Sequence, residues 1–213
     1  MTTSLRERRR QALHEDILDA ARNILAEKGY NAMSMDDLAA QAGISKPTLY
    51  SYFATKDEIV TAAIVREIDR LLVMTEPGEL AGTPLQRMTR ILETVVQLQM
   101  REQRQPIRMW MPEMHKLGCE HPKLLNAIEQ LDRSLTALVG EAIAGGEIDA
   151  EFDPASVVRI FYALVTAAIR TPYSAGNDFD PLTAPRLIAR VFRRGIQAAQ
   201  SPQEDAHGNQ LAD

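Results

Sequence analysis

The sequence predicts an all-α fold, and three observations support this. Residues that favour helices, chiefly Ala, Leu, Glu, Gln and Arg, are abundant throughout the 213-residue chain. Only 5% of the residues are aromatic, and β-branched residues do not alternate with polar ones as they do in half-buried strands. Apolar residues instead recur three or four positions apart over most of the sequence. We therefore expect helices nearly everywhere.

Composition also indicates a compartment. The single cysteine, Cys119, excludes an intramolecular disulfide and suits a reducing environment. The N-terminus is charged and lacks the apolar core of a secretory signal, and the longest apolar run, residues 160–169, is too short to span a membrane. These features predict a cytoplasmic protein without a membrane segment.

Charge is unevenly distributed along the chain. The net charge is −5, but residues 1–56 hold eight Lys/Arg and seven Asp/Glu, whereas the remainder holds 16 and 22. Only the N-terminal part therefore suits a polyanionic partner. Arg6, Arg8, Arg9 and Arg10 predict a basic arm ahead of the first helix, which either contacts phosphate or is a solvated tail.

The first two helices are predicted from their ends. An apolar stripe reaches Lys28, and Gly29 follows it as a C-terminal cap should. Ser34 and Asp37 then have the spacing of a capping box, with Asp in place of the usual Glu or Gln. They predict a second helix over residues 35–42.

A third and a fourth helix follow at once. Gly43 supplies a tight turn at little conformational cost, and Ser45 is an N-cap for a third helix over residues 46–53. Thr55 then caps a longer helix that carries an apolar stripe and links two parts of the chain over residues 57–75. Two short helices joined by a glycine turn bury little surface alone, so they must pack on their neighbours as a helix-turn-helix.

The second helix of such a unit can lie in the major groove of DNA. Within residues 46–53, Lys46 and Thr48 can donate hydrogen bonds, and Tyr50 and Tyr52 carry hydroxyls on rigid rings. Two other interpretations remain open from spacing alone. The unit could be a compact helical subdomain whose tyrosines pack internally, or an interaction module that binds no DNA.

The residues also resemble a known family. From Ile17 to Ile59, the stretch ILDAARNILAEKGYNAMSMDDLAAQAGISKPTLYSYFATKDEI is similar to the tetracycline-repressor (TetR) family of bacterial transcriptional regulators, and its most specific pieces are AAQAGIS, TLYSYF and the lysine of TKDEI. The resemblance implies a dimeric, ligand-responsive repressor that binds a palindromic operator through residues 46–53. Beyond residue 75 the similarity is one of architecture only.

Carried over by position, the resemblance assigns roles to individual residues. Lys46 and Thr48 are expected to face the groove, and Tyr50, Tyr52 and Lys56 to contact phosphates. The full set of expected DNA contacts is Lys46, Pro47, Thr48, Tyr50, Ser51, Tyr52, Lys56, Ser34 and Arg9.

The rest of the chain is expected to bind a ligand and to dimerise. Breaker residues over 75–84 mark its first loop. The expected division is a DNA-binding domain with its basic arm over 1–56, a ligand-binding and dimerisation domain over 57–200, and a disordered tail over 201–213. Further helices are expected after Thr83 and over 107–117, 122–144, 154–170 and 185–200.

Two of these helices are candidates for a homodimer interface. Apolar residues cover more than one face of helix 154–170, and a single stripe with small residues runs along helix 185–200. A four-helix bundle across a two-fold axis would bury both, although an ordinary intramolecular core would fit the same periodicity.

A pocket for a small, largely apolar effector is expected in the bundle. Its candidate lining is Trp110, Met114, Phe161, Tyr162 and Tyr173, and the alternative is a flexible core built from the same residues. No cofactor and no resident metal are expected.

A second class of function uses the same region differently. His115, Cys119 and His121 could bind a soft metal, sense oxidants or serve a helical enzyme without DNA binding. The sequence lacks a phosphate-cradling glycine loop, a G-x-S-x-G elbow and an H-E-x-x-H motif, so no catalytic residues and no enzyme activity are expected.

Overall fold

The computed structural model describes residues 4–101, 117, 120–167, 180 and 182–198 of the chain. The described residues form helices joined by turns and loops. In addition, Ile148 pairs with Gln197 in one isolated antiparallel bridge. The predicted all-α class is confirmed. The helices are α1 (Leu5–Ala32), α2 (Met35–Gln41), α3 (Lys46–Tyr50), α4 (Lys56–Thr75), α5 (Pro84–Arg101), α7 (Pro122–Ala144), α8 (Pro154–Ala167) and α9 (Ala184–Ile196).

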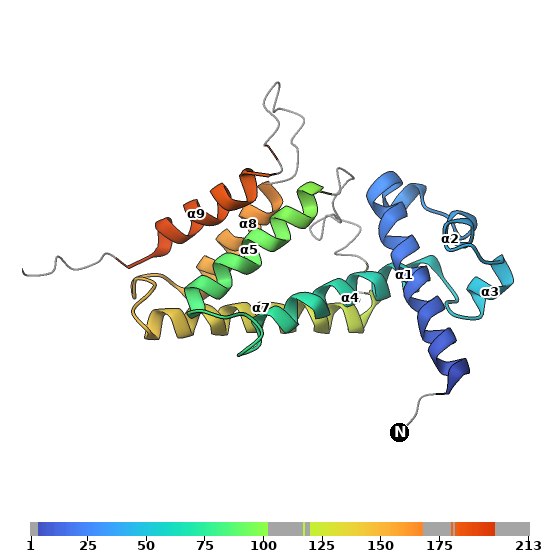
Figure 1. The fold of residues 1–213 in the computed structure, drawn as a ribbon, viewed down its shortest axis with the longest axis horizontal. Coiled ribbons are helices and arrows are strands. Elements are labelled where there is room, and N and C mark those ends of the chain that lie inside the picture. The colour runs from blue at the N-terminus through green and yellow to red at the C-terminus, as the bar shows by residue number, and fades with distance from the viewer. Residues whose placement is uncertain (1–3, 102–116, 118–119, 168–179, 181, 199–213) are drawn as a thin grey trace, which may run out of the picture.

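Helices α1, α2 and α3 gather at one end of the molecule (Figure 1). The predicted caps are present: the hydroxyls of Ser34, Ser45 and Thr55 each accept a hydrogen bond from a backbone N–H in the first turn of α2, α3 and α4. Gly43 has a φ of 67°, the left-handed conformation that the tight turn between α2 and α3 requires.

Gly29 breaks α1 as expected, with φ 75° and ψ 171° inside an otherwise helical segment. The prediction of a basic arm ahead of the first helix is wrong, because α1 already begins at Leu5. Ser4 and Glu7 form a capping box there that satisfies the first backbone N–H groups, so Arg6 to Arg10 lie on helix.

Helix α3 is shorter than the predicted 46–53. The N–H of Ser51 is shared between the carbonyls of Pro47 and Thr48, and the chain then turns so that Phe53 is buried. Helix α9 also ends early, because Gln197 leaves the helix to pair with Ile148. The last residues predicted for helix 154–170, the helix over 107–117 apart from Leu117, and the tail 201–213 lie outside the described residues.

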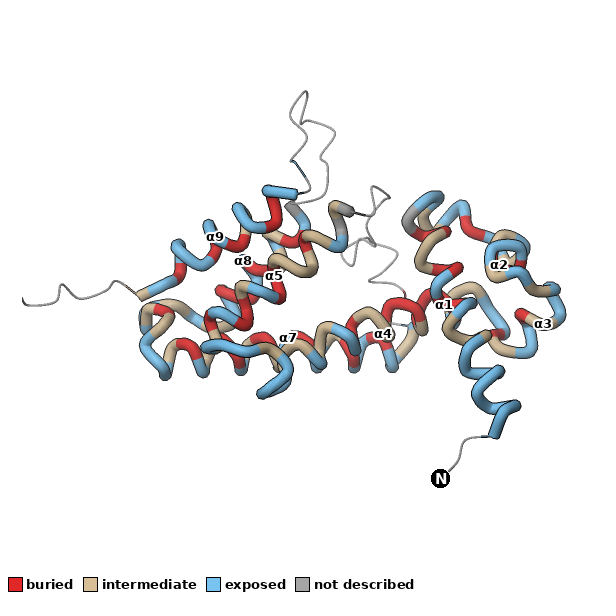
Figure 2. Tube along the Cα trace, in the orientation of Figure 1, coloured by how far each residue is buried: buried red, intermediate tan, exposed pale blue. Residues whose placement is uncertain are grey.

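Helix α4 belongs to both ends of the molecule. It packs against α1 through its first half and runs along α7, while α5 packs against α9 and α8 against α7 (Figure 1). Buried side chains form one continuous core from Ile17 in α1, through Ile59 and Ile68 in α4, to Phe192 and Ile196 in α9 (Figure 2). No loop separates the helix-turn-helix from the bundle at this junction.

The C-terminal end of α4 is held by a buried arginine. Arg87 of α5 is only 7% exposed, donates a hydrogen bond to the carbonyl of Thr75, and lies 3.9 Å from a carboxylate oxygen of Glu141 in α7. A guanidinium here neutralises an unpaired carbonyl at the negative end of the helix dipole. None of the helices in the described ranges is long and apolar enough to cross a membrane.

Candidate nucleic-acid interface

Helix α3 is anchored by two apolar side chains and leaves its opposite face open. Leu49 is fully buried and Phe53, just beyond the helix, is nearly so, whereas Lys46, Pro47 and Tyr50 are exposed. Tyr50 keeps 47% of its surface accessible, which excludes the interpretation that this tyrosine is an internal packing residue. The result is a short helix with one buried and one exposed face, and the exposed face carries Lys46, Pro47 and Tyr50. Figure 2 shows that α3 is largely exposed.

The hydroxyls of this face are organised locally. Thr48 Oγ1 lies 2.7 Å from Ser45 Oγ, and Ser51 donates to the carbonyl of Thr48 at 2.7 Å. Ser34 is exposed at the start of α2, where its hydroxyl donates to Asp37 at 2.7 Å. These groups keep unused hydrogen-bonding capacity that can face a groove or a phosphate.

An ion pair joins the two helices of the motif at the exposed surface. The ammonium of Lys46 lies 2.8 Å from Oδ1 of Asp36, with 49% and 72% of the two side chains accessible. The Asp36 carboxylate raises the pKa of Lys46, so this lysine is held in its charged form.

The first turns of α1 carry exposed arginines close to this face. The guanidinium of Arg10 lies over the ring of Tyr52, 5.8 Å from its centre, and leaves that ring half-buried. Arg9 is exposed on the same helical segment. These basic residues therefore lie on a helix instead of a tail, and Figure 2 shows that the first turns of α1 are exposed.

Lys56 is placed differently from the exposed lysine of α3. Its ammonium donates to the carbonyl of Tyr30 at 3.1 Å and to the carbonyl of Met33 at 3.2 Å, and it lies 4.2 Å from the centre of the Tyr30 ring. The Tyr30 carbonyl also accepts a hydrogen bond from the backbone N–H of Met33 at 3.3 Å, at the C-terminal end of α1. Lys56 therefore joins the start of α4 to the connection between α1 and α2.

A second contact strengthens the same junction. The hydroxyl of Tyr30 donates to Asp57 at 2.5 Å. Burial and then the hydrogen bond to this carboxylate raise the pKa of Tyr30 to about 12, so the phenol stays protonated and remains a donor.

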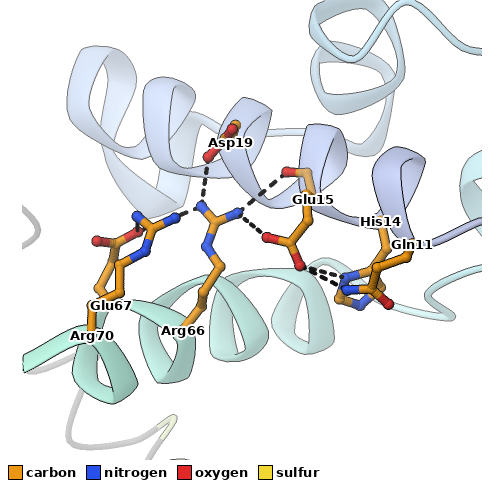
Figure 3. A network of polar contacts seen from close by, with 7 residues as sticks. All are labelled: Gln11, His14, Glu15, Asp19, Arg66, Glu67 and Arg70. Carbon is orange, nitrogen blue, oxygen red and sulfur yellow. Dashed lines mark hydrogen bonds and ion pairs between the residues drawn. The ribbon is translucent and has the colours of Figure 1, made fainter. Parts of the chain in front are cut away.

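The middle of α1 is joined to α4 by a polar network (Figure 3). Arg66 of α4, with only 13% of its side chain accessible, contacts Glu15 at 2.9 Å and Asp19 at 2.7 Å. The hydrogen bond from Arg66 is the main cause that lowers the pKa of Glu15. Glu67 lies 3.5 Å from Arg66 and 2.9 Å from Arg70. Sequence reasoning missed the contacts of Arg66 with Glu15 and Asp19, because they join residues 51 and 47 positions apart.

The expected ligand pocket is only partly visible. Trp110, Met114 and Tyr173 lie outside the described residues. Phe161 is buried against Phe192, with ring centres 6.1 Å apart, and Tyr162 is half-buried at 5.8 Å from Phe161. Burial, assisted by Asp132, raises the pKa of Tyr162 above the ordinary phenol value.

A hollow opens elsewhere, at the end of the bundle where the bridge forms. Its lining contains none of the expected pocket residues and consists of Leu85, Gln86, Gly146, Glu147, Arg193, Gln197 and Ala198. Of the three candidate metal or redox residues, His115 and Cys119 lie outside the described residues. Among the part of the chain that the structure does describe, no group of three or more His, Cys, Asp or Glu side chains is placed to hold a metal ion.

The fold and the exposed α3 define a helix-turn-helix protein with a C-terminal helical bundle. Residues 17–63 match the family model described as "Bacterial regulatory proteins, tetR family". Residues 17–63 of this chain are therefore similar to that family. The match includes α2, α3 and the first turns of α4, which carry most of the expected DNA contacts.

Two curated relatives match over part of the chain. The chain is similar to the transcriptional activator FasR of Mycolicibacterium smegmatis, with 41% identity over 56 residues that cover 26% of each protein. It is similar to the transcriptional repressor KstR of the same species, with 39% identity over 84 residues that cover 39% of each. The matched part of the chain thus spans less than half the length of either relative.

Solved structures extend the likeness to the whole fold. The regulator FadR of Bacillus subtilis, solved in complex with stearoyl-CoA, superimposes with a TM-score of 0.67 at 19% identity, covering 86% of this chain and 99% of that chain. The ketosteroid regulator KstR2 of Mycobacterium tuberculosis gives a TM-score of 0.64 at 20% identity, covering 87% and 95%. At these identities the comparison establishes a shared fold.

Proposed function

We propose that the protein is a transcriptional regulator that binds a palindromic DNA operator through α3. The observation that carries the proposal is the outer face of α3, which is exposed and polar while Leu49 and Phe53 fix the helix from beneath. A helix presented in this way fits the major groove with its N-terminal residues near base edges. Lys46 and Thr48 would read bases, and Pro47, Tyr50, Ser51, Ser34 and Arg9 would contact the backbone or the groove wall.

Two expected contacts take modified roles in this proposal. Tyr52 would approach phosphate together with Arg10, whose guanidinium lies over its ring. Lys56 would act mainly by positioning, because its ammonium already serves the carbonyls of Tyr30 and Met33. The domain boundary proposed from the sequence, at residue 56, coincides with the start of α4, a helix that packs against α1 in one domain and against α7 in the other.

We propose a homodimer through α8 and α9. Both helices bury one face in the protomer and leave apolar side chains on the other: Ile160 is 46% exposed, Leu187 50% and Val191 58%. Leu187, Val191 and the exposed Gly195 lie four residues apart on α9, so they form one stripe. A two-fold partner would cover it, and two copies of α3 could then read half-sites one helical turn apart.

The bundle would bind a small, largely apolar effector that releases the protein from DNA. Support comes from the apolar cluster of Phe161, Tyr162 and Phe192 in the bundle and from the fold shared with FadR, whose solved complex contains stearoyl-CoA. Because α4 packs on both α1 and α7, a ligand that displaces α7 would also move the helix-turn-helix. Ligand and DNA would then oppose each other's binding reciprocally.

Repression is the proposed direction of control, although the relatives include an activator as well as repressors. A protein that covers an operator and leaves it when an effector binds needs no contact with the transcription machinery. Repression is therefore the simplest mechanism that fits a DNA-binding surface on α3 and an effector site in the bundle.

The decisive experiment selects bound sequences from a random duplex library with the purified protein and then titrates the best duplex across salt concentrations. We expect a two-fold related consensus and a linear fall of log affinity with log salt, since phosphate contacts release counterions. Failure to enrich any sequence at low salt would remove α3 as a DNA-reading helix.

A further inference from the structure

Asp36 occupies an unusual place for a carboxylate on a surface that is proposed to face a polyanion. It lies in the first turn of α2, and its Oδ1 is 2.8 Å from the ammonium of Lys46 at the first turn of α3. The ion pair therefore crosses the tight turn and joins the two helices of the motif on their outer side.

Folding does not explain this pair. Both side chains are largely accessible, and exposed ion pairs contribute little to stability because water and salt screen them. The neighbouring Asp37 has a structural role, since it closes the capping box with Ser34 and binds Lys28 at 2.8 Å. Asp36 takes no part in that box.

The pair has a clear consequence for DNA recognition. A lysine on a flexible stem at this surface would swing to the nearest phosphate, and phosphate contacts carry no sequence information. A carboxylate next to the ammonium repels phosphates and restricts the lysine to a position beside the N-terminal end of α3. There its donors can meet the O6 and N7 acceptors of guanine.

We propose that Asp36 is a specificity-determining residue, which positions Lys46 to read a guanine in each half-site at a cost in general affinity for DNA. This inference rests on the proposed function of α3. It treats Asp36 as a positioning residue and Lys46 as the residue that touches the base. Discrimination obtained by disfavouring wrong partners has the same logic in other specific interfaces.

The test uses the full-length protein and the duplex selected by the wild type. Affinities of the wild type, Asp36→Ala and Asp36→Asn are measured for that duplex, for single-position variants of it and for a scrambled duplex. Glu151→Gln is the matched control, because it removes one negative charge in the turn between α7 and α8, far from α3 (Figure 1).

We expect Asp36→Ala to bind the scrambled duplex more tightly and to lose about tenfold or more of the preference for guanine at one position of each half-site. The salt slope should become steeper by about 1 per protomer, because the freed lysine gains a phosphate. Asp36→Asn should fall between wild type and Asp36→Ala, since its amide oxygen still accepts from Lys46 without repelling phosphate. Glu151→Gln should leave the base preference and the slope unchanged.

A double-mutant comparison completes the test. Lys46→Ala should lose the same guanine preference, and adding Asp36→Ala to it should change the preference no further. If Asp36→Ala instead strengthens binding to every duplex equally and keeps the guanine preference, Asp36 is only a repulsive charge and the inference is wrong. If the wild type enriches no sequence at all, the failure lies with the proposed function of α3. Thermal unfolding of each variant verifies that the exposed substitution leaves the fold intact.

Discussion

The ammonium of Lys56 lies 3.1 Å from the carbonyl oxygen of Tyr30 and 4.2 Å from the centre of the Tyr30 ring. One side chain thus adds a charged donor to a carbonyl near the C-terminal end of α1, and it does so from the first residue of α4. The orientation of α4 and the entry into α2 are therefore set by the same contact.

Replacing Lys56 distinguishes its two possible roles, which are to position α4 against the end of α1 and to contact a DNA phosphate. We expect Lys56→Met to lower the free energy of unfolding by about 1–3 kcal/mol, because two carbonyls lose a charged donor. Operator affinity should also fall, but the salt slope should stay within about 0.3 of the wild-type value, since no phosphate contact is lost. Urea unfolding and salt titrations measure the two effects. A slope reduced by about 0.9 would instead make Lys56 a phosphate contact.

The buried and exposed sides of α3 should respond oppositely to truncation. Leu49→Ala removes a fully buried side chain and should cost about 2–5 kcal/mol of stability. Tyr50→Ala should leave the free energy of unfolding within about 0.5 kcal/mol and weaken operator binding. Urea unfolding measures the stability of the two variants, and gel retardation measures their affinity for the operator. Strong destabilisation by Tyr50→Ala would contradict the division of α3 into a buried and an exposed side.

The network around Arg66 should stabilise the contact between α1 and α4. Arg66→Ala leaves Glu15 and Asp19 without their cation, and because both carboxylates are partly accessible we expect a loss of about 1–2 kcal/mol (Figure 3). Arg70→Ala is the control, since Arg70 is exposed and should change stability by less than about 0.5 kcal/mol. Equal effects of the two substitutions on urea unfolding would contradict a special role for Arg66.

Stability should depend on pH through Asp37. The hydrogen bond from Lys28, followed by those of Ser34, lowers the pKa of Asp37 from 3.8 to about 2. The folded state binds the proton less readily than the unfolded chain, so this contribution is fully present above pH 3.8 and disappears as the pH falls through about 2. The melting temperature of Asp37→Asn should therefore vary less between pH 4 and pH 2 than that of the wild type. Parallel pH profiles of the two proteins would exclude the assignment.

The proposed dimer can be tested by charge. Val191→Glu places a carboxylate in the middle of the exposed stripe of α9 and should convert the dimer to a monomer in sedimentation experiments, with loss of operator affinity. Val73→Glu is the matched control, because Val73 is 46% exposed on α4 and lies outside α8 and α9. A dimer that survives Val191→Glu would place the interface elsewhere.

Local signals explain which features could be predicted. The bounds of α7 were predicted correctly because Pro122 can begin a helix and Gly145 can end one, and the hydroxyls of Ser34, Ser45 and Thr55 act within their own turns. The predicted end of α3 was wrong because the end depends on how Phe53 packs into the core, and this tertiary contact leaves no signal in the local sequence. The likeness of residues 17–59 to one family predicted the class of protein, and the family model confirms it over 17–63.

Contacts between helices could not be predicted. The pairs of Lys46 with Asp36 and of Arg66 with Asp19 join surfaces that meet only after packing, and neither has a sequence spacing that marks it. The same holds for Lys56. Its position at the start of α4 predicted a contact with a DNA phosphate, but in the folded chain its ammonium donates to the carbonyls of Tyr30 and Met33. The ligand pocket depends on Trp110, Met114 and Tyr173 and remains a prediction.

The unbroken course of α4 determines how motion can pass through this molecule. A helix of 20 residues is about 30 Å long and nearly incompressible, so a displacement at its α7 end reaches α1 as a tilt instead of being absorbed by a linker. A tilt of about 5° over that length corresponds to about 2.6 Å at the far end. In a two-fold assembly the two copies of α4 would tilt in opposite directions, so the change in distance between the two DNA-binding units would double to about 5 Å, close to the pitch of one α-helical turn.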